Sequence, residues 1–182
     1  MLIILTGKTA SGKDTVISKL LSLLPGFKKV VTTTSRPPRD GEQSGVDYFF
    51  ISREDFKQKI ERGNFIEYVE YGGNFYGTEK TQLMDANQDL IWKIDPSRAG
   101  KIRELIDSRV LVIYLTVDDS VVLERLRKRG FSQEDINKRM SEDQKLWEEY
   151  KDSYDFVVKN VPGQLNQTIN KIIQIIRPGH SV

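Results

Sequence analysis

The stretch that decides the fold reads LIILTGKTASGKDT and covers residues Leu2–Thr15. It begins with a short apolar run, Leu2–Leu5, which predicts a β-strand buried on both faces. A glycine-rich segment of the form G-x-x-x-x-G-K follows, and then a helical pattern with apolar residues spaced from Ile17 to Leu24. A strand, a glycine-rich turn and a helix in this order predict a phosphate-binding loop.

This loop pattern has a physical basis. Glycines at Gly7 and Gly12 let the backbone curl so that successive N–H groups point at phosphate oxygens, and the dipole of the following helix favours an anion. Lys13 bridges the outer phosphates. The alternative is a glycine-rich turn that binds no ligand. The residues expected to bind a nucleoside triphosphate are Gly7, Lys8, Thr9, Ala10, Ser11, Gly12, Lys13, Asp14 and Thr15.

Asp14 departs from the usual pattern, in which a hydroxyl residue follows the lysine and binds Mg²⁺. A carboxylate is also a good ligand for Mg²⁺, so the loop can still hold the metal. In the absence of metal the same carboxylate would repel the nucleotide phosphates.

Composition excludes several other kinds of chemistry. The chain has 182 residues with a net charge of +2, it has no cysteine, and its single histidine is His180. We therefore expect one compact domain with small insertions, no thiol or Ser-His-Asp catalysis, and no multi-histidine metal site. A nearly neutral chain also argues against nucleic acid polymers or membranes as partners. Without a signal peptide or membrane-span pattern, we expect a cytoplasmic protein.

The rest of the chain alternates between apolar runs and amphipathic helices, which predicts an α/β fold with helices on both faces of a five-stranded parallel sheet. The expected strands are Leu2–Leu5, Val30–Thr33, Leu90–Ile94, Val110–Leu115 and Phe156–Val158. A second helix is expected over Leu165–Ile176, and the tail after Arg177 is expected to be frayed.

Two stretches depart from this alternation. Residues 45–78 predict short strands around one helix, whose start is marked by a capping box at Ser52 and Asp55, followed by a hairpin at Gly72–Asn74. Residues 127–152 are rich in charge and predict either a mobile helical lid or an ordinary solvated helical hairpin.

A second candidate phosphate site lies at Arg36 and Arg39, which flank a stiff Pro-Pro pair. Arginine suits bidentate phosphate binding, and Tyr48 can add a hydroxyl donor. Two phosphate sites indicate two phosphorylated substrates. A surface turn with solvated charges is the alternative.

Together these segments resemble guanylate kinase, a P-loop nucleoside monophosphate kinase of purine nucleotide metabolism. The resemblance rests on the phosphate loop, Thr33–Tyr48, Phe65–Thr78, Arg129-Gly130 with Ile136–Met140, and Tyr154–Asn160, in the family's order and near its spacing. It implies phosphoryl transfer from ATP to GMP with Mg²⁺. It also implies a core of about residues 1–32, 86–126 and 153–182, a GMP-binding lobe of about 33–85 and a lid of about 127–152. The oligomeric state is not implied.

Carried over by position, the resemblance also implies roles for single residues. Arg36, Arg39, Tyr48 and Tyr76 would hold the GMP phosphate, and Glu67 and Thr78 would read the base. Guanine presents N1–H and a 2-amino group to a carboxylate, whereas adenine would leave Glu67 desolvated and unpaired. A surface carboxylate is the alternative for Glu67. The full expected GMP site is Thr32, Arg36, Arg39, Glu42, Tyr48, Glu67, Tyr76, Thr78 and Asp95, with Thr32 and Thr78 replacing the family's common serines.

The expected catalytic groups are Lys13, Arg39, Arg129 and Arg139, and the last two match the family's lid arginines. Asp14 and Asp95 are the candidate metal ligands. Lys93 is a second departure, since the family usually has an acidic residue there, and we expect Asp14 to restore the carboxylate lost at this position. A P-loop kinase for another phosphate acceptor and a non-catalytic guanylate-kinase-like binding module are the competing interpretations.

Overall fold

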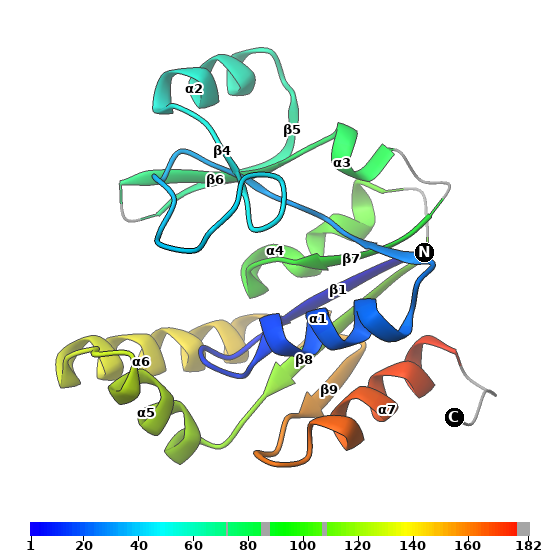
Figure 1. Cartoon of the computed structure of the whole chain (residues 1–182), viewed down its shortest axis with the longest axis vertical. Helices are drawn as coiled ribbons and strands as arrows, with labels where there is room; N and C mark the ends of the chain where they lie inside the picture. Colours follow the sequence, from blue (N-terminus) through cyan, green and yellow to red (C-terminus); the bar gives the residue numbers. More distant parts are fainter. Residues whose placement is uncertain (72, 85–87, 107–108, 178–182) are drawn as a thin grey trace. The chain divides into compact units, whose positions relative to one another are not determined.

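The computed structural model describes the whole chain apart from residues 72, 85–87, 107–108 and 178–182 (Figure 1). His180 and the hairpin position Gly72 therefore lie outside the described residues. The chain divides into two compact units. We call Met1–Lys28 with Ile91–Val182 the core unit, and Lys29–Leu90 the inserted unit.

A five-stranded sheet with the order β2-β7-β1-β8-β9 forms the centre of the core unit. β1 pairs with β8, and β8 with β9, in parallel, with Leu2 opposite Val110 and Ile113 opposite Phe156. The predicted parallel sheet and α/β fold are confirmed. The strands are β1 (Leu2–Gly7), β2 (Phe27–Lys29), β7 (Asp89–Lys93), β8 (Val110–Thr116) and β9 (Phe156–Lys159).

Helices cover both faces of this sheet because its strands are apolar on both sides. Ile113 and Leu115 belong to the apolar cluster that includes α1 and α7, which lie side by side in Figure 1. Tyr114, between them on β8, contacts Trp147 of α6 instead, with ring centroids 5.0 Å apart. The helical segments are α1 (Lys13–Leu23), α4 (Pro96–Ala99), η1 (Lys101–Glu104), α5 (Asp119–Lys128), α6 (Gln133–Tyr150), η2 (Lys151–Ser153) and α7 (Leu165–Ile176).

The prediction of a strand over Val30–Thr33 was wrong. The core strand β2 ends at Lys29, and the chain re-enters β structure at Thr33–Thr34, the strand β3 of the inserted unit. Val30 and Val31 are buried although they lie in the connection between the two strands. Their apolar character therefore reflects burial rather than strand pairing, a distinction that a short apolar run does not carry.

A four-stranded mixed sheet with the order β4-β3-β6-β5 forms the inserted unit. β3 runs parallel to β4 and antiparallel to β6, and β5 and β6 form the predicted hairpin. Phe56 of α2 stacks on Phe65 and Phe75, at 4.3 and 5.2 Å between ring centroids. The remaining elements are β4 (Phe49–Phe50), α2 (Arg53–Glu61), β5 (Phe65–Tyr71), β6 (Asn74–Glu79) and α3 (Thr81–Met84).

Local signals place these elements as the sequence indicates. Ser52 caps α2, because its Oγ accepts a hydrogen bond from the backbone N–H of Asp55 at 3.0 Å. Gly77 allows β5 and β6 to approach closely, since a Cβ there would lie 2.9 Å from the carbonyl oxygen of Glu67. The hairpin register then sets Glu67 opposite Thr78.

Candidate functional site

The phosphate loop begins where β1 ends against β8. Gly7 is buried against Leu115, where a Cβ would overlap the Leu115 backbone, and Lys8 N donates to Leu115 O at 3.0 Å. The loop then turns through left-handed conformations at Ala10 (φ 55°) and Gly12 (φ 90°). Such a conformation costs a residue with a Cβ on the order of 1 kcal/mol. Contacts around the loop, such as the hydrogen bond from Arg125 to Ala10 O, keep Ala10 in this conformation.

Three side chains hold the loop carbonyls, one from α1, one from α5 and one from the connection after β9. Lys13 Nζ donates to the carbonyl oxygens of Gly7 and Lys8, both at 2.8 Å. Arg125 Nη1 of α5 donates to Ala10 O at 2.6 Å, and Asn160 Nδ2, just after β9, donates to Ser11 O at 2.8 Å. Thr168 of α7 in turn donates to Asn160 Oδ1 at 3.1 Å. Fixing the carbonyls in this way fixes the direction of the peptide N–H groups as well.

Two carboxylates contact Lys8 and Thr9, which lie between the two glycines of the loop. Thr9 donates twice to Asp143 of α6, from N to Oδ2 at 2.7 Å and from Oγ1 to Oδ1 at 3.1 Å. Lys8 forms an ion pair with Asp119 at the start of α5. Sequence reasoning missed Arg125, Asn160, Asp119 and Asp143 as parts of the site. Asn160 had a usable signal, because it is a polar residue at the carboxyl end of a parallel strand.

Lys13 interacts with several charged side chains of the core unit. Burial lowers the pKa of its ammonium group to about 8, against the charges of Asp143, Asp14 and Asp95, which raise that pKa. The charge of Lys93 lowers it further. Burial also raises the pKa of the Asp143 carboxyl, although the hydrogen bonds from Thr9 and the charge of Lys13 act in the opposite direction. An anion binding next to Lys13 would favour its charged form.

The candidate metal ligands lie close to this lysine. Asp14, in the first turn of α1, forms an ion pair with Lys93, with Oδ1 2.5 Å from Nζ. Asp95 follows β7 and caps α4, with Oδ1 accepting from Ser97 N at 2.9 Å and from Ser97 Oγ at 2.6 Å. Within the described part of the chain, no group of three or more His, Cys, Asp or Glu side chains is arranged to hold a metal ion.

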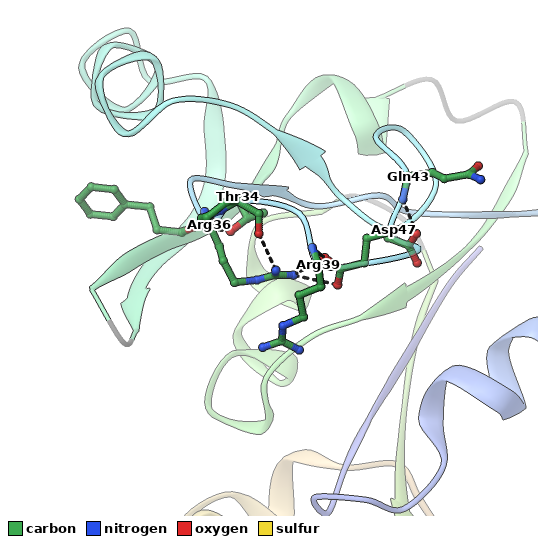
Figure 2. A network of polar contacts seen from close by, with 8 residues as sticks. Thr34, Arg36, Arg39, Gln43 and Asp47 are labelled. Atoms are coloured by element: carbon green, nitrogen blue, oxygen red, sulfur yellow. Dashed lines mark hydrogen bonds and ion pairs between the residues drawn. The ribbon is translucent and has the colours of Figure 1, made fainter. Parts of the chain in front are cut away.

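Arg36 and Arg39 of the inserted unit, both labelled in Figure 2, share hydrogen bonds with Glu42. Arg36 Nη2 donates to both Glu42 carboxylate oxygens at 2.8 Å, and the backbone N–H of Arg39 donates to Glu42 Oε2 at 2.7 Å. The bond from Arg39 N, followed by those from Arg36, lowers the pKa of the Glu42 carboxyl. Figure 2 shows the Arg39 guanidinium group pointing away from this network. Glu42 therefore positions both arginines and leaves the second one extended.

Aromatic rings complete the cluster. The Arg36 guanidinium lies 5.7 Å from the ring centroid of Tyr48 and 5.8 Å from that of Phe50. Tyr48 meets Tyr76 edge to face, with ring centroids 6.2 Å apart. These rings limit the positions open to the Arg36 side chain and place two phenol groups beside it.

Glu67 and Thr78 lie opposite each other on β5 and β6 of the same unit. Thr78 is buried, and its Oγ1 donates to Glu67 Oε1 at 2.9 Å. Thr32 is partly buried before β3, where its carbonyl oxygen accepts from Phe49 N at 2.8 Å. The structure thus brings together Arg36, Glu42, Tyr48 and Tyr76, and separately Glu67 with Thr78.

The predicted lid arginines lie on α5 and α6. Arg129 is exposed and ends α5, with its backbone N–H donating to Arg125 O at 3.2 Å. Arg139 lies 4.6 Å from the ring centroid of Phe131, in the turn between the two helices. Their described contacts are therefore with the helical hairpin itself. Across the described residues, no helix is both long and apolar enough to cross a membrane.

Comparisons of this chain with family models, curated proteins and solved structures all identify the same family. A family model described as guanylate kinase matches residues 1–178. A guanylate kinase of Fusobacterium nucleatum is 32% identical over 98% of this chain and 96% of its own length. One of Latilactobacillus sakei is 38% identical over 96% and 88%, respectively. The crystal structure of guanylate kinase from Anaplasma phagocytophilum has a TM-score of 0.70 at 28% identity, covering 98% of this chain and 84% of that one.

Proposed function

The chain belongs to the guanylate kinase family, and we propose that it transfers a phosphoryl group from ATP to GMP, giving ADP and GDP. The observation that carries this proposal is the pair of Glu67 and Thr78 in the inserted unit. It offers a carboxylate and a hydroxyl side by side, in the same unit as the Arg36 cluster. A phosphate loop in the core unit supplies the second nucleotide site.

ATP would bind at residues 7–15. Side chains hold the carbonyls of Ala10 and Ser11 and so fix the path of the loop at the N-terminus of α1, where the phosphates would bind. Lys13 would exchange its bonds to the carbonyls of Gly7 and Lys8 for bonds to phosphate oxygens. This exchange replaces neutral carbonyl acceptors with charged phosphate acceptors, which form stronger hydrogen bonds with the ammonium group.

The GMP phosphate would bind at Arg36, Arg39, Tyr48 and Tyr76. Glu42 fixes the guanidinium plane of Arg36 with two bonds, and such an arrangement lowers the entropy lost when phosphate binds. Arg39 extends from the same network and supplies a second fork. Thr32 and Asp95 are the remaining residues that the family resemblance assigns to GMP.

Guanine would be selected by Glu67 and Thr78. The Glu67 carboxylate accepts from N1–H and the 2-amino group, and the Thr78 hydroxyl donates to O6. A hydroxyl has one proton to donate, so the bond from Thr78 to Glu67 must be exchanged for the bond to guanine O6. Adenine offers neither of these donors to Glu67 and would leave its charge unpaired.

The reaction needs no general base, because the attacking oxygen of GMP is already anionic. Catalysis consists of positioning two anions and neutralising their repulsion, a role we assign to Lys13, Arg39, Arg129 and Arg139. For the lid arginines, this role requires Arg139 to exchange its contact with Phe131 for the phosphates. Excluding water from the closed site would prevent hydrolysis of ATP.

Two carboxylates, Asp14 of the loop and Asp95 after β7, fit a magnesium ion. Mg²⁺ is usually held by one or two carboxylates together with substrate phosphates. Asp14 and Asp95 are two such carboxylates, and both influence the same lysine, Lys13. When bound, Mg²⁺ would neutralise phosphate charge. Asp14 would then divide its two oxygens between Lys93 and the metal.

A coupled assay of ADP release with GMP, dGMP, AMP, CMP and UMP as acceptors tests this function. Turnover specific for guanine nucleotides supports it. Preference for another acceptor would instead indicate a different P-loop kinase, and ATP or GMP binding without turnover would indicate a non-catalytic module. Lys13→Met is the matched control, since it removes the central cation while keeping side-chain length.

A further inference from the structure

Asp143 contacts the phosphate loop in the way a phosphate would. Its two carboxylate oxygens accept from the N–H and the hydroxyl of Thr9, at 2.7 and 3.1 Å. The carboxylate comes from α6, at 134 positions from Thr9 along the chain. One residue of the loop thus gives both of its donors to an anion that belongs to another element.

The charges around this contact also suit an anion. Lys13 and Lys8 both attract the Asp143 carboxylate, which is partly buried. The same lysines would attract the terminal phosphates of a nucleotide. A carboxylate and a phosphate cannot occupy the Thr9 donors together, because both are anions and each donor serves one short bond.

We propose that Asp143 is an internal competitor for the terminal phosphate of ATP, so that nucleotide binding releases Asp143 and shifts α6. This inference rests on the proposed function of the loop as the ATP site. It makes Asp143 a positioning residue that couples occupancy of the loop to the helix that carries Arg139.

The surroundings of Asp143 allow such a release. A cavity of about 490 Å³ borders Lys8, Asp143, Gln144 and Trp147, which leaves space for the released carboxylate and for a shift of this part of α6. Trp147 lies one turn further along α6, with its ring centroid 5.0 Å from that of Tyr114 and 6.1 Å from that of Tyr154. A shift of this part of α6 would change the stacking of Trp147.

Calorimetric titration of ATP into Asp143→Ala, Asp143→Asn and the wild type tests the competition. We expect Asp143→Ala to bind ATP about threefold to tenfold more tightly, because both hydrogen bonds from Thr9 to the competing carboxylate are removed. AMP, which lacks the outer phosphates, should bind all variants alike. Glu142→Gln, the neighbouring acid on α6, controls for the loss of a negative charge.

The sign of the effect separates competition from simple support of the loop. If Asp143 only supported the loop, its removal would weaken ATP binding, and that result would overturn the proposal. Equal tightening in Glu142→Gln would also overturn it, because a general charge effect would then suffice. Asp143→Glu should restore affinity toward the wild-type value.

Trp147 fluorescence provides a second, independent measurement. The chain has two tryptophans, so Trp92→Phe leaves Trp147 as the single reporter. We expect ATP to change its emission in this background, and to change it much less when Asp143→Ala is added. An equal change in both backgrounds would contradict the proposal. If Trp92→Phe does not fold, the calorimetric comparison still decides it.

These outcomes are distinguishable from failure of the proposed function. Wild-type turnover of GMP together with unchanged ATP affinity in Asp143→Ala would overturn the competition alone. Tighter ATP binding in Asp143→Ala without any turnover of GMP would support the competition and contradict the kinase activity.

Discussion

Lys93 and Asp14 form an ion pair that joins the end of β7 to the first turn of α1, with Nζ 2.5 Å from Oδ1. A phosphate loop usually has a hydroxyl residue at the position of Asp14. The family that this chain resembles usually has an acidic residue at the position of Lys93. The chain therefore has a carboxylate where a hydroxyl is usual and a cation where an acid is usual, and the structure brings the two into contact.

This contact predicts that the two positions are coupled. Asp14→Ser removes the partner of the pair, and Lys93→Asp sets two carboxylates near each other, so each single variant should lose ATP affinity and kcat/KM. The double variant should recover part of the loss, with a coupling free energy of about 0.5–3 kcal/mol. Measuring kcat/KM for ATP at several Mg²⁺ concentrations completes the cycle. Strictly additive losses would show that the pair has no functional role.

The low pKa of Lys13 predicts that ATP affinity falls at high pH. A lysine with a pKa of about 8 is charged below that pH and neutral above it, and only the charged form attracts phosphate. ATP should therefore bind more weakly above this pKa, and binding there should take up a proton. Titration calorimetry in buffers of different ionisation enthalpy, one unit above and one unit below the pKa, measures this uptake. Equal proton uptake at both pH values would contradict the assignment.

The free energy of unfolding should depend on pH in the opposite direction to ATP affinity. Since burial disfavours the charged form of Lys13, the folded protein gives up this proton at lower pH than the unfolded chain does. Between the folded-state pKa of about 8 and the usual lysine pKa of 10.5, the unfolded state binds more protons. The contribution of Lys13 to the free energy of unfolding should therefore rise with pH across that window. Comparing chemical denaturation of the wild type and Lys13→Met across the window checks the direction.

Substitution of Glu67 should remove GMP recognition selectively. Glu67→Gln replaces a charged acceptor with a neutral amide. We therefore expect the KM for GMP to rise by a factor that corresponds to about 2 kcal/mol or more, with ATP affinity unchanged. Glu70→Gln is the matched control on the same strand. Its ion pair with Arg53 is exposed, and such pairs contribute little. Equal effects of both substitutions would indicate a general effect on β5.

Arg39 should act on the acceptor side. Arg39→Ala should abolish most GMP turnover while ATP binding persists, because the residue lies in the inserted unit and its guanidinium extends from the Glu42 network. Arg39→Lys should recover little, since an ammonium group lacks the bidentate fork. Steady-state kinetics for GMP and calorimetry for ATP separate the two effects. Loss of ATP affinity in Arg39→Ala would contradict this placement.

The predictable parts of this molecule are those set by local patterns. Leu2–Gly7 and the helix after it follow from one strand, one glycine-rich turn and one periodic segment, and Ser52 caps α2 through a residue three positions away. The strand predicted at Val30–Thr33 was wrong because Val30 and Val31 are apolar residues of a buried connection. Such a run has no period that distinguishes a connection from a strand.

The contacts that complete the phosphate loop could not be read from the sequence. Arg125 and Asn160 reach the loop from 115 and 149 positions away, and Asp143 from 134. Each is an ordinary polar residue in its own segment, and Asp143 lies in a helix rich in similar charges. Only the order of strands in the sheet, which sets β1 beside β8 and β8 beside β9, brings these residues to one place.

The most direct test of the account follows the phosphoryl group itself. ATP labelled in its γ-phosphoryl group is incubated with the protein and GMP, and the products are separated. The proposed kinase activity predicts that the label appears in the β-phosphate of GDP, and that Glu67→Gln strongly reduces this transfer. Label found only in inorganic phosphate, or in another nucleotide in preference to GDP, would contradict it.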